Sequence, residues 1–152
     1  MYFKNVMLGG SKTIGNLSER VELQMEVLIN SGERFLVGDC HGADLAFQNY
    51  LHASGYSNVT VYCSGEKCRF NVGGWVEVHV PVEDGVEGYD FYRQKDLAMI
   101  AEADGAVLLW DGRSAATKEN RKALAAKGAA IFTYRTDQRQ MRVIRRRLRE
   151  NT

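Results

Sequence analysis

Short apolar runs recur along the chain, with longer stretches of mixed residues between them. Five of the runs are rich in β-branched or large apolar residues, which predicts buried strands. They cover residues 6–8, 35–37, 59–62, 106–109 and 129–134. Residues 76–80 alternate between apolar and polar side chains and are followed by Pro81, so we expect an edge strand there.

The stretches between the runs carry apolar residues at helical spacing. Such residues recur every three or four positions from Leu17 to Leu28, and Gly32 stands where a left-handed cap would end the helix. Asn16, with Glu19 three residues later, resembles a capping box at its start. Three further helices are predicted at 43–54, 89–102 and 117–126.

Strands that alternate with helices of this length predict an α/β fold. We expect three layers, with a mostly parallel sheet of about five strands and helices on both faces. The pattern shows no linker, so residues 1–135 are predicted to form one domain and the basic segment 136–152 a C-terminal helix or tail of it. The glycine-containing stretch 63–75 predicts a long irregular loop.

Composition narrows the class of protein. Hydrophobic residues make up 45% of the 152 positions and one proline is present, which argues against a disordered chain. The longest apolar runs fall short of the roughly 18 residues of a membrane span, and the N-terminus lacks a signal-peptide pattern. The three cysteines show no framework spacing, which is typical of a reducing compartment. We therefore expect a cytoplasmic protein without a membrane partner.

The charge is unevenly placed along the chain. Six arginines against Asp137 and Glu150 give residues 136–152 a charge of +4, which leaves −3 on the remaining body. The body is therefore not expected to bind nucleic acid, and only the tail argues for such a partner. The alternative is an amphipathic terminal helix, because Met141, Ile144 and Leu148 fall at helical spacing.

Three turns that follow predicted strands carry glycine and small polar residues. Ligands of parallel α/β folds bind beyond the carboxyl ends of the strands, and a helix start offers unpaired N–H groups to a phosphate. The glycine and polar residues of these three turns are therefore candidate ligand-binding residues. They are Gly9, Gly10, Ser11, Gly38, Asp39, Gly42, Asp44, Asp111, Gly112, Arg113, Ser114 and Thr117.

Each of these candidates also has a structural interpretation. The glycines form tight turns, and Asp39 or Ser114 caps a helix. Asp96, on the helix predicted at 89–102, either orients a sugar hydroxyl or forms a surface ion pair.

The cysteines give little indication of a metal site or a reactive thiol. Cys63 and Cys68, with His79 or His41, have too loose a spacing for a zinc motif, and no second ligand pair follows. Cys40 precedes a helix start but has no histidine–carboxylate pattern around it. We therefore predict no metal site and no cofactor.

Taken in order, the motifs resemble the SLOG superfamily of Rossmann-like proteins, which includes the Lonely guy cytokinin-activating enzymes and the DNA-processing protein A fold. The matching segments are 9–11, 38–44, 95–99 with 103–104, and 110–117. The resemblance implies a Rossmann-like fold, a site for a nucleotide or nucleotide-derived molecule and, often, a homodimer. Some relatives hydrolyse a base–sugar bond and others only sense a nucleotide.

The resemblance also implies two catalytic candidates. Asp96 matches the aspartate of the glycosidase relatives, whereas the position of their nucleophilic glutamate is held by Asn120 when the pattern is laid on Ser114 without a gap. Asn120 then becomes a ligand-binding candidate for a ribose or base. Glu119 lies one residue earlier, about 100° around a helix, and a one-residue slip in the turn restores it as the nucleophile.

We therefore expect a sensor or ligand-binding protein for a nucleotide-type small molecule. Two alternatives stay open: a nucleotide N-glycosidase using Asp96 and Glu119, and an interaction module acting through the arginine-rich tail. A homodimer is also expected, because an apolar set on the helix predicted at 89–102 exceeds one buried helix face. That set is Tyr89, Phe91, Tyr92, Leu97 and Ile100.

Overall fold

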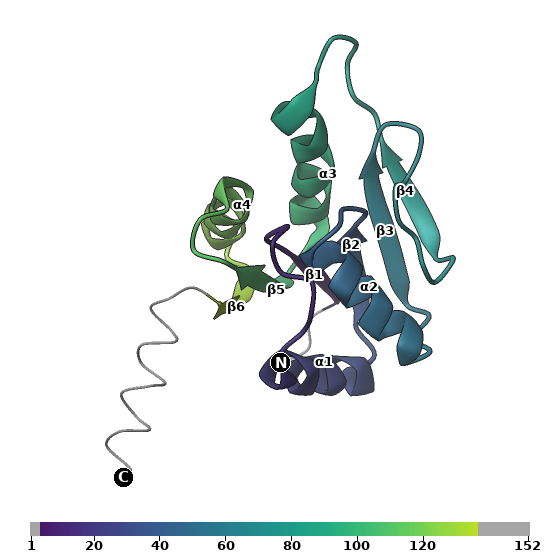
Figure 1. The fold of residues 1–152 in the computed structure, drawn as a ribbon, viewed down its shortest axis with the longest axis vertical. Helices are drawn as coiled ribbons and strands as arrows, with labels where there is room; N and C mark the ends of the chain where they lie inside the picture. The colour runs from purple at the N-terminus through teal and green to yellow at the C-terminus, as the bar shows by residue number, and fades with distance from the viewer. Residues whose placement is uncertain (1–3, 137–152) are drawn as a thin grey trace.

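A computed structural model of the chain contains one parallel sheet flanked by helices (Figure 1). It describes residues 4–136, so the predicted basic tail lies outside the described residues except for Thr136. The helices are α1 (Glu19–Ser31), α2 (Ala43–Ala53), α3 (Gly88–Glu102) and α4 (Ala115–Ala126). The strands are β1 (Asn5–Gly10), β2 (Arg34–Gly38), β3 (Val59–Ser64), β4 (Val76–Val80), β5 (Gly105–Trp110) and β6 (Ala130–Arg135).

The sheet has six strands in the order β4-β3-β2-β1-β5-β6, and every pairing is parallel. This confirms the predicted α/β, Rossmann-like fold with three layers. The sheet has one strand more than the five expected, because residues 76–80 pair with β3 at the edge. Most of β4 is exposed, which explains its alternating sequence pattern.

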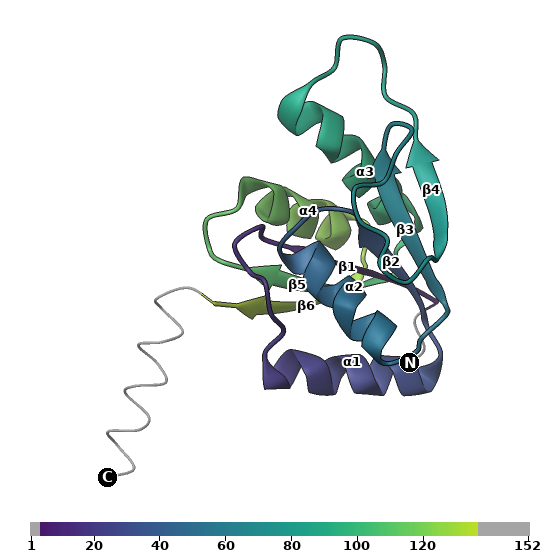
Figure 2. The same ribbon diagram turned by 45° about the vertical axis from the view of Figure 1, so that its right-hand side comes forward.

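Successive side chains of the central strands point to opposite faces, and each face packs on its own pair of helices. Leu8, Phe35 and Val107 lie in a core shared with α1 and α2. Met7 and Leu108 lie in the opposite core, shared with α3 and α4. Figure 2 shows the sheet between these two helix layers.

In the described part of the chain, the helices are too short or too polar to cross a membrane.

The ends of α1 show how local sequence sets element boundaries. Gly32 caps the helix with φ 80°, as predicted. The predicted capping box at Asn16 is wrong, because the helix begins two residues later and the Ser18 hydroxyl accepts a hydrogen bond from the Val21 N–H at 3.3 Å. Serine is a preferred N-cap residue because its side-chain oxygen accepts a hydrogen bond from one of the unpaired N–H groups at the helix start.

The topology places one switch point at the middle of the sheet. The chain proceeds outward from β1 through β2 and β3 to β4, and then α3 returns it to β5 on the other side of β1. Ligands of open α/β sheets bind where the winding direction reverses, beyond the carboxyl ends of the strands. The turns after β1 and β5 meet at this point.

Candidate functional site

A cavity of about 700 Å³ opens at the switch point between β1 and β5. Its walls come from the end of β1, the turns after β1 and β5, the start of α2 with Asp44, one side of α3, the start of α4 and Arg69 from the loop between β3 and β4. Its charged lining residues are Lys12, Asp44, Arg69, Arg93, Lys95, Asp96, Asp111 and Arg113. Five cations thus face three carboxylates, so the cavity favours an anionic ligand.

The turn after β1 forms one wall of the cavity. Gly10 and Gly42 lie where backbone segments pack so closely that a Cβ would overlap the Leu109 and Lys12 carbonyl oxygens. Ser11 is buried behind this wall, where its carbonyl accepts from the Ala43 N–H at 3.2 Å and its hydroxyl accepts from the Asp111 N–H at 3.0 Å. Ser11 therefore joins the three predicted turns and does not itself line the cavity.

Asp111 organises the turn after β5. Its carboxylate accepts from the N–H groups of Arg113 and Ser114, each at 2.8 Å, and from the Thr13 hydroxyl at 2.7 Å. Burial disfavours the ionised form, but these donors outweigh it and lower the pKa of Asp111 to about 2. Asp111 is therefore ionised at neutral pH and fixes the shape of the turn.

The first turn of α4 points unpaired donors at the cavity. Ser114 caps the helix, with its hydroxyl accepting from the Thr117 N–H at 3.3 Å. Within the described residues, the N–H groups of Ala115 and Ala116 have no hydrogen-bond acceptor, and both residues line the cavity. A helix start with free N–H groups and a positive dipole end can hold a phosphate or another anion.

A buried lysine forms the charged centre of the site. The Lys95 Nζ lies 3.3 Å from the Asp44 carboxylate and 3.2 Å from that of Asp96. Burial would lower the pKa of Lys95, but the two carboxylates outweigh it and raise the pKa well above its ordinary value. Burial also raises the pKa of Asp44, because removal from water penalises its charged form; Lys95 opposes this rise and the nearby Asp96 carboxylate adds to it. Gly38 leaves room for this group, since a Cβ there would overlap the Asp44 carboxylate.

Asp96 is further held by Arg93, whose Nη1 is 3.6 Å away, and by the Asn120 amide at 3.1 Å. Arg93 also donates to the Asn120 side-chain oxygen. Asp96 and Asn120 both line the cavity. Glu119, by contrast, is exposed and does not line it. Consecutive residues of a helix point about 100° apart, so α4 directs Asn120 inward and Glu119 toward solvent.

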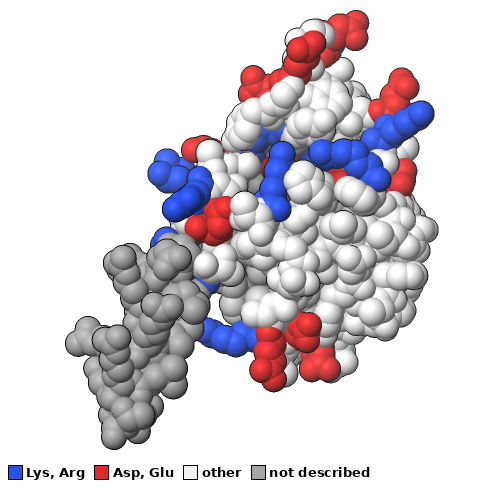
Figure 3. Space-filling model, in the orientation of Figure 1, with Lys and Arg blue, Asp and Glu red and all other residues white. Residues whose placement is uncertain are grey.

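An arginine on an aromatic ring forms the outer wall. Arg69 donates to the Asp39 carboxylate through both its backbone N–H, at 2.9 Å, and its guanidinium, at 3.0 Å and 3.2 Å. The guanidinium lies 4.3 Å from the centroid of the Tyr92 ring, and the Lys12 ammonium lies 5.9 Å from the same ring. Figure 3 shows Lys and Arg side chains in a band across this face of the molecule.

The structure thus divides the predicted site residues into two groups. Those that line the cavity are Gly9, Gly10, Asp44, Asp96, Asp111, Arg113, Ser114, Thr117 and Asn120. Those that do not are Ser11, Gly38, Asp39, Gly42, Gly112 and Glu119. Several of the second group act indirectly: Asp39 holds Arg69, and Gly38 and Gly42 allow the close packing behind the wall.

Sequence reasoning missed Lys12, Arg69, Lys95 and Tyr92 as members of the site. Tyr92 and Lys95 face the cavity three residues apart on α3, at helical spacing, and this periodicity was the available signal. Arg69 had no such signal, because an irregular loop brings it from the other side of the sheet.

The apolar set that motivated the predicted homodimer is partly used within the chain. Tyr89 and Tyr92 line the cavity, and Ile100 is buried in the core under α3. Leu97 stays exposed on the helix. The homodimer stays a prediction.

Comparisons with protein-family models, curated proteins and solved structures found no significant match to this chain.

Proposed function

We propose that this chain binds a nucleotide or a nucleotide-derived small molecule in the cavity at the switch point, as a sensor or ligand-binding protein. The observation that carries the proposal is the start of α4. Two unpaired N–H groups there face a cavity in which cations outnumber carboxylates. The volume of about 700 Å³ suits a ligand of nucleotide size.

Each part of a nucleotide has a matching wall. The phosphate belongs at Ala115 and Ala116, with Arg113 beside it, because free N–H groups and a guanidinium both donate to phosphate oxygens. Tyr92, with Arg69 on its ring, offers a flat polar-rimmed surface for the base. Asp96 and Asn120 lie deeper on α3 and α4, where a carboxylate and an amide suit sugar hydroxyls. The order of the motifs, which resembles the SLOG superfamily, supports the same ligand class.

The proposal is tested by thermal shift with a panel of nucleosides and nucleotides that differ only in phosphate number. A ligand at one hundred times its dissociation constant stabilises the folded state by about 2.7 kcal/mol. We expect nucleotides to stabilise the chain and the matching nucleosides to do so much less, because the phosphate supplies the charge. Equal shifts for both would contradict a phosphate site.

Replacing Ser114 by aspartate is expected to weaken nucleotide binding about tenfold or more, equivalent to about 1.4 kcal/mol, because a carboxylate would face the phosphate. Aspartate is as good an N-cap as serine, so α4 is expected to keep its start. Titration calorimetry measures the affinity, with Ser114→Asn as the uncharged control. Unchanged affinity in Ser114→Asp would place the phosphate elsewhere.

We propose binding without hydrolysis of the base–sugar bond. A glycosidase of the type considered above needs a second ionised carboxylate, besides Asp96, as the nucleophile at the sugar, and Glu119 is exposed outside the cavity. No free base is therefore expected from a panel of ribo- and deoxyribonucleotides, measured by chromatography. Turnover by the wild-type chain that disappears in Glu119→Gln but persists in the control Glu83→Gln would favour the enzyme.

A further inference from the structure

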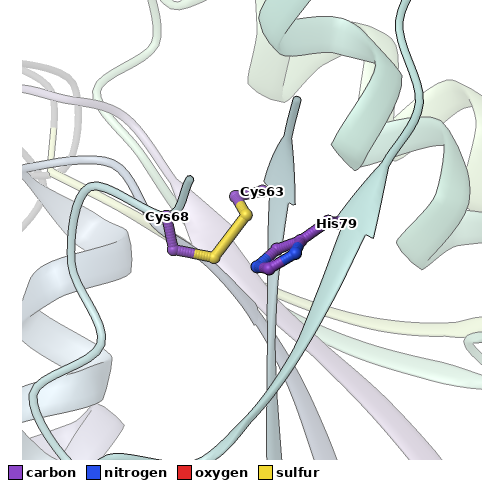
Figure 4. A group of neighbouring side chains, drawn as sticks. All are labelled: Cys63, Cys68 and His79. Atoms are coloured by element: carbon purple, nitrogen blue, oxygen red, sulfur yellow. A yellow bond between two sulfur atoms is a disulfide. The ribbon is translucent and has the colours of Figure 1, made fainter. Parts of the chain in front are cut away.

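A second cluster of chemically active side chains lies away from the cavity, at the β3–β4 edge of the sheet. Cys63 and His79 are direct partners in the parallel pairing of β3 with β4. Cys68 comes back to them from the loop after β3 and forms a disulfide with Cys63, with a Cα–Cα distance of 5.1 Å. Figure 4 shows the imidazole of His79 beside the two sulfur atoms. The cysteine spacing in the sequence had not indicated this bond.

We propose that the reduced protein binds one zinc ion through Cys63, Cys68 and His79. One ligand atom from each of the three residues lies within 4.8 Å of the others. In a tetrahedral zinc site, Zn–S and Zn–N bonds of about 2.3 Å and 2.0 Å place the ligand atoms roughly 3.5–3.8 Å apart. When the disulfide is broken, the two sulfur atoms move apart. A final distance of roughly 3.5–3.8 Å between them matches the spacing of ligands in a tetrahedral zinc site.

The ligand set suits zinc rather than a harder cation. Two thiolates and one imidazole are soft or borderline donors, which bind zinc in preference to magnesium or calcium. The pairing of two adjacent strands fixes Cys63 and His79 without any ordering of a loop. After reduction Cys68 is still held near them, because the next residue, Arg69, donates its backbone N–H and its guanidinium to Asp39. The reduced chain therefore needs little rearrangement to supply three ligands.

A carboxylate next to the histidine supports the site. The Glu77 Oε1 lies 2.8 Å from the His79 Nε2, and the other oxygen accepts from the Asn71 amide at 2.9 Å. Because Nε2 is bonded to Glu77, the proposal uses Nδ1 as the zinc ligand. Ligating histidines in zinc sites commonly donate their other ring N–H to such a carboxylate, which orients the ring and strengthens the ligand.

The disulfide and the zinc ion exclude each other, because both use the same two sulfur atoms. A dithiol reductant of the thioredoxin or glutathione-dependent class transfers two electrons and two protons to the Cys63–Cys68 bond and is itself oxidised to a disulfide. The S–S bond breaks and two thiols form. Binding of Zn²⁺ then releases both thiol protons to water, because only thiolates ligate the metal.

The disulfide and the zinc ion would each hold the same segment of chain, the loop that carries Cys68. Cys68 directly precedes Arg69, whose guanidinium bonds to Asp39 and lies on Tyr92 at the cavity wall. A zinc ion in the reduced protein would therefore keep the loop closed where the disulfide closes it in the oxidised protein. The metal site itself does not depend on the proposed nucleotide ligand.

The test uses the full chain, reduced with a phosphine and freed of reductant without oxygen. Zn²⁺ is added in competition with a chromophoric chelator, and Co²⁺ is used in parallel to record thiolate-to-cobalt absorption. We expect about one zinc ion per reduced chain, no binding by the oxidised chain, and the thiolate absorption in the Co²⁺ form only after reduction.

Variants separate a built site from adventitious thiol binding. Cys68→Ser is expected to abolish zinc binding, and His79→Gln to weaken it at least about tenfold, since a ligand is lost. The matched controls Cys40→Ser and His41→Gln are expected to bind like the wild type, because neither residue belongs to the cluster. Circular dichroism checks that each variant is folded. The proposal is overturned if the reduced wild type binds no zinc, or if His79→Gln binds it as tightly as the wild type.

Discussion

Replacing Lys95 by methionine is expected to destabilise the folded chain by about 3–5 kcal/mol, because it leaves a buried carboxylate without its counter-charge. The Lys95 and Asp44 side chains are only 6% and 9% exposed, and their charged atoms lie 3.3 Å apart. Methionine fills a similar volume but carries no charge. Asp96 keeps Arg93 and Asn120 as partners, whereas Asp44 keeps, among residues 4–136, only the Cys40 N–H at 3.1 Å.

Urea denaturation followed by circular dichroism measures this loss, with the exposed Lys118→Met as the matched control. The control is expected to change stability by less than about 0.5 kcal/mol. A loss below about 1 kcal/mol in Lys95→Met would contradict this, because it would show that the carboxylates do not depend on the lysine for stabilisation.

The loss of folding stability caused by Lys95→Met is expected to become smaller as the pH falls. The folded-state pKa of Asp44 is already raised above the ordinary 3.8 by burial, and it rises further without the lysine. As the pH falls through this raised pKa, the folded chain takes up a proton before the unfolded chain does, which stabilises the folded state. The gain is complete once the pH is below the ordinary value, where both states are protonated.

Replacing Gly42 by alanine is expected to cost about 2–4 kcal/mol, the second largest effect. Gly42 has φ 83°, a left-handed conformation that disfavours a side chain, and a Cβ would overlap the Lys12 carbonyl oxygen. The added methyl therefore pushes the turn after β1 away from α2. Lys12 and Thr13 line the cavity, so ligand affinity is expected to fall as well.

The matched control is Gly15→Ala, in the same segment of chain. A Cβ at Gly15 meets no atom within 4 Å, and its backbone lies outside the left-handed region. We expect thermal denaturation to leave this control within a few tenths of a kcal/mol of the wild type, or slightly more stable, because alanine restricts the unfolded chain. Equal losses in both variants would mean that general loop flexibility, and not the contact with Lys12, is responsible.

Most of the secondary structure was predictable, because it rests on local signals. Residues 35–37 and 106–109 read as strands since buried parallel strands are apolar on both faces, and the structure has β2 and β5 there. Gly32 ended its helix as predicted, because only glycine adopts the left-handed cap without strain. The start of α1 was misplaced by two residues, since Asn16 and Ser18 are both good caps and the local pattern does not choose between them.

The sequence by itself therefore determined the class of fold and the turns at the carboxyl edge of the sheet, because periodicity and glycine act over a few residues. The tertiary structure decided what those turns do. It sent Ser11 behind the cavity wall, turned Asn120 inward and Glu119 outward, and brought Arg69 onto Tyr92 across the sheet. It also paired Cys63 with Cys68 and set His79 beside them. Such contacts join residues far apart in the chain, and their geometry depends on strand order and register, which no local pattern encodes.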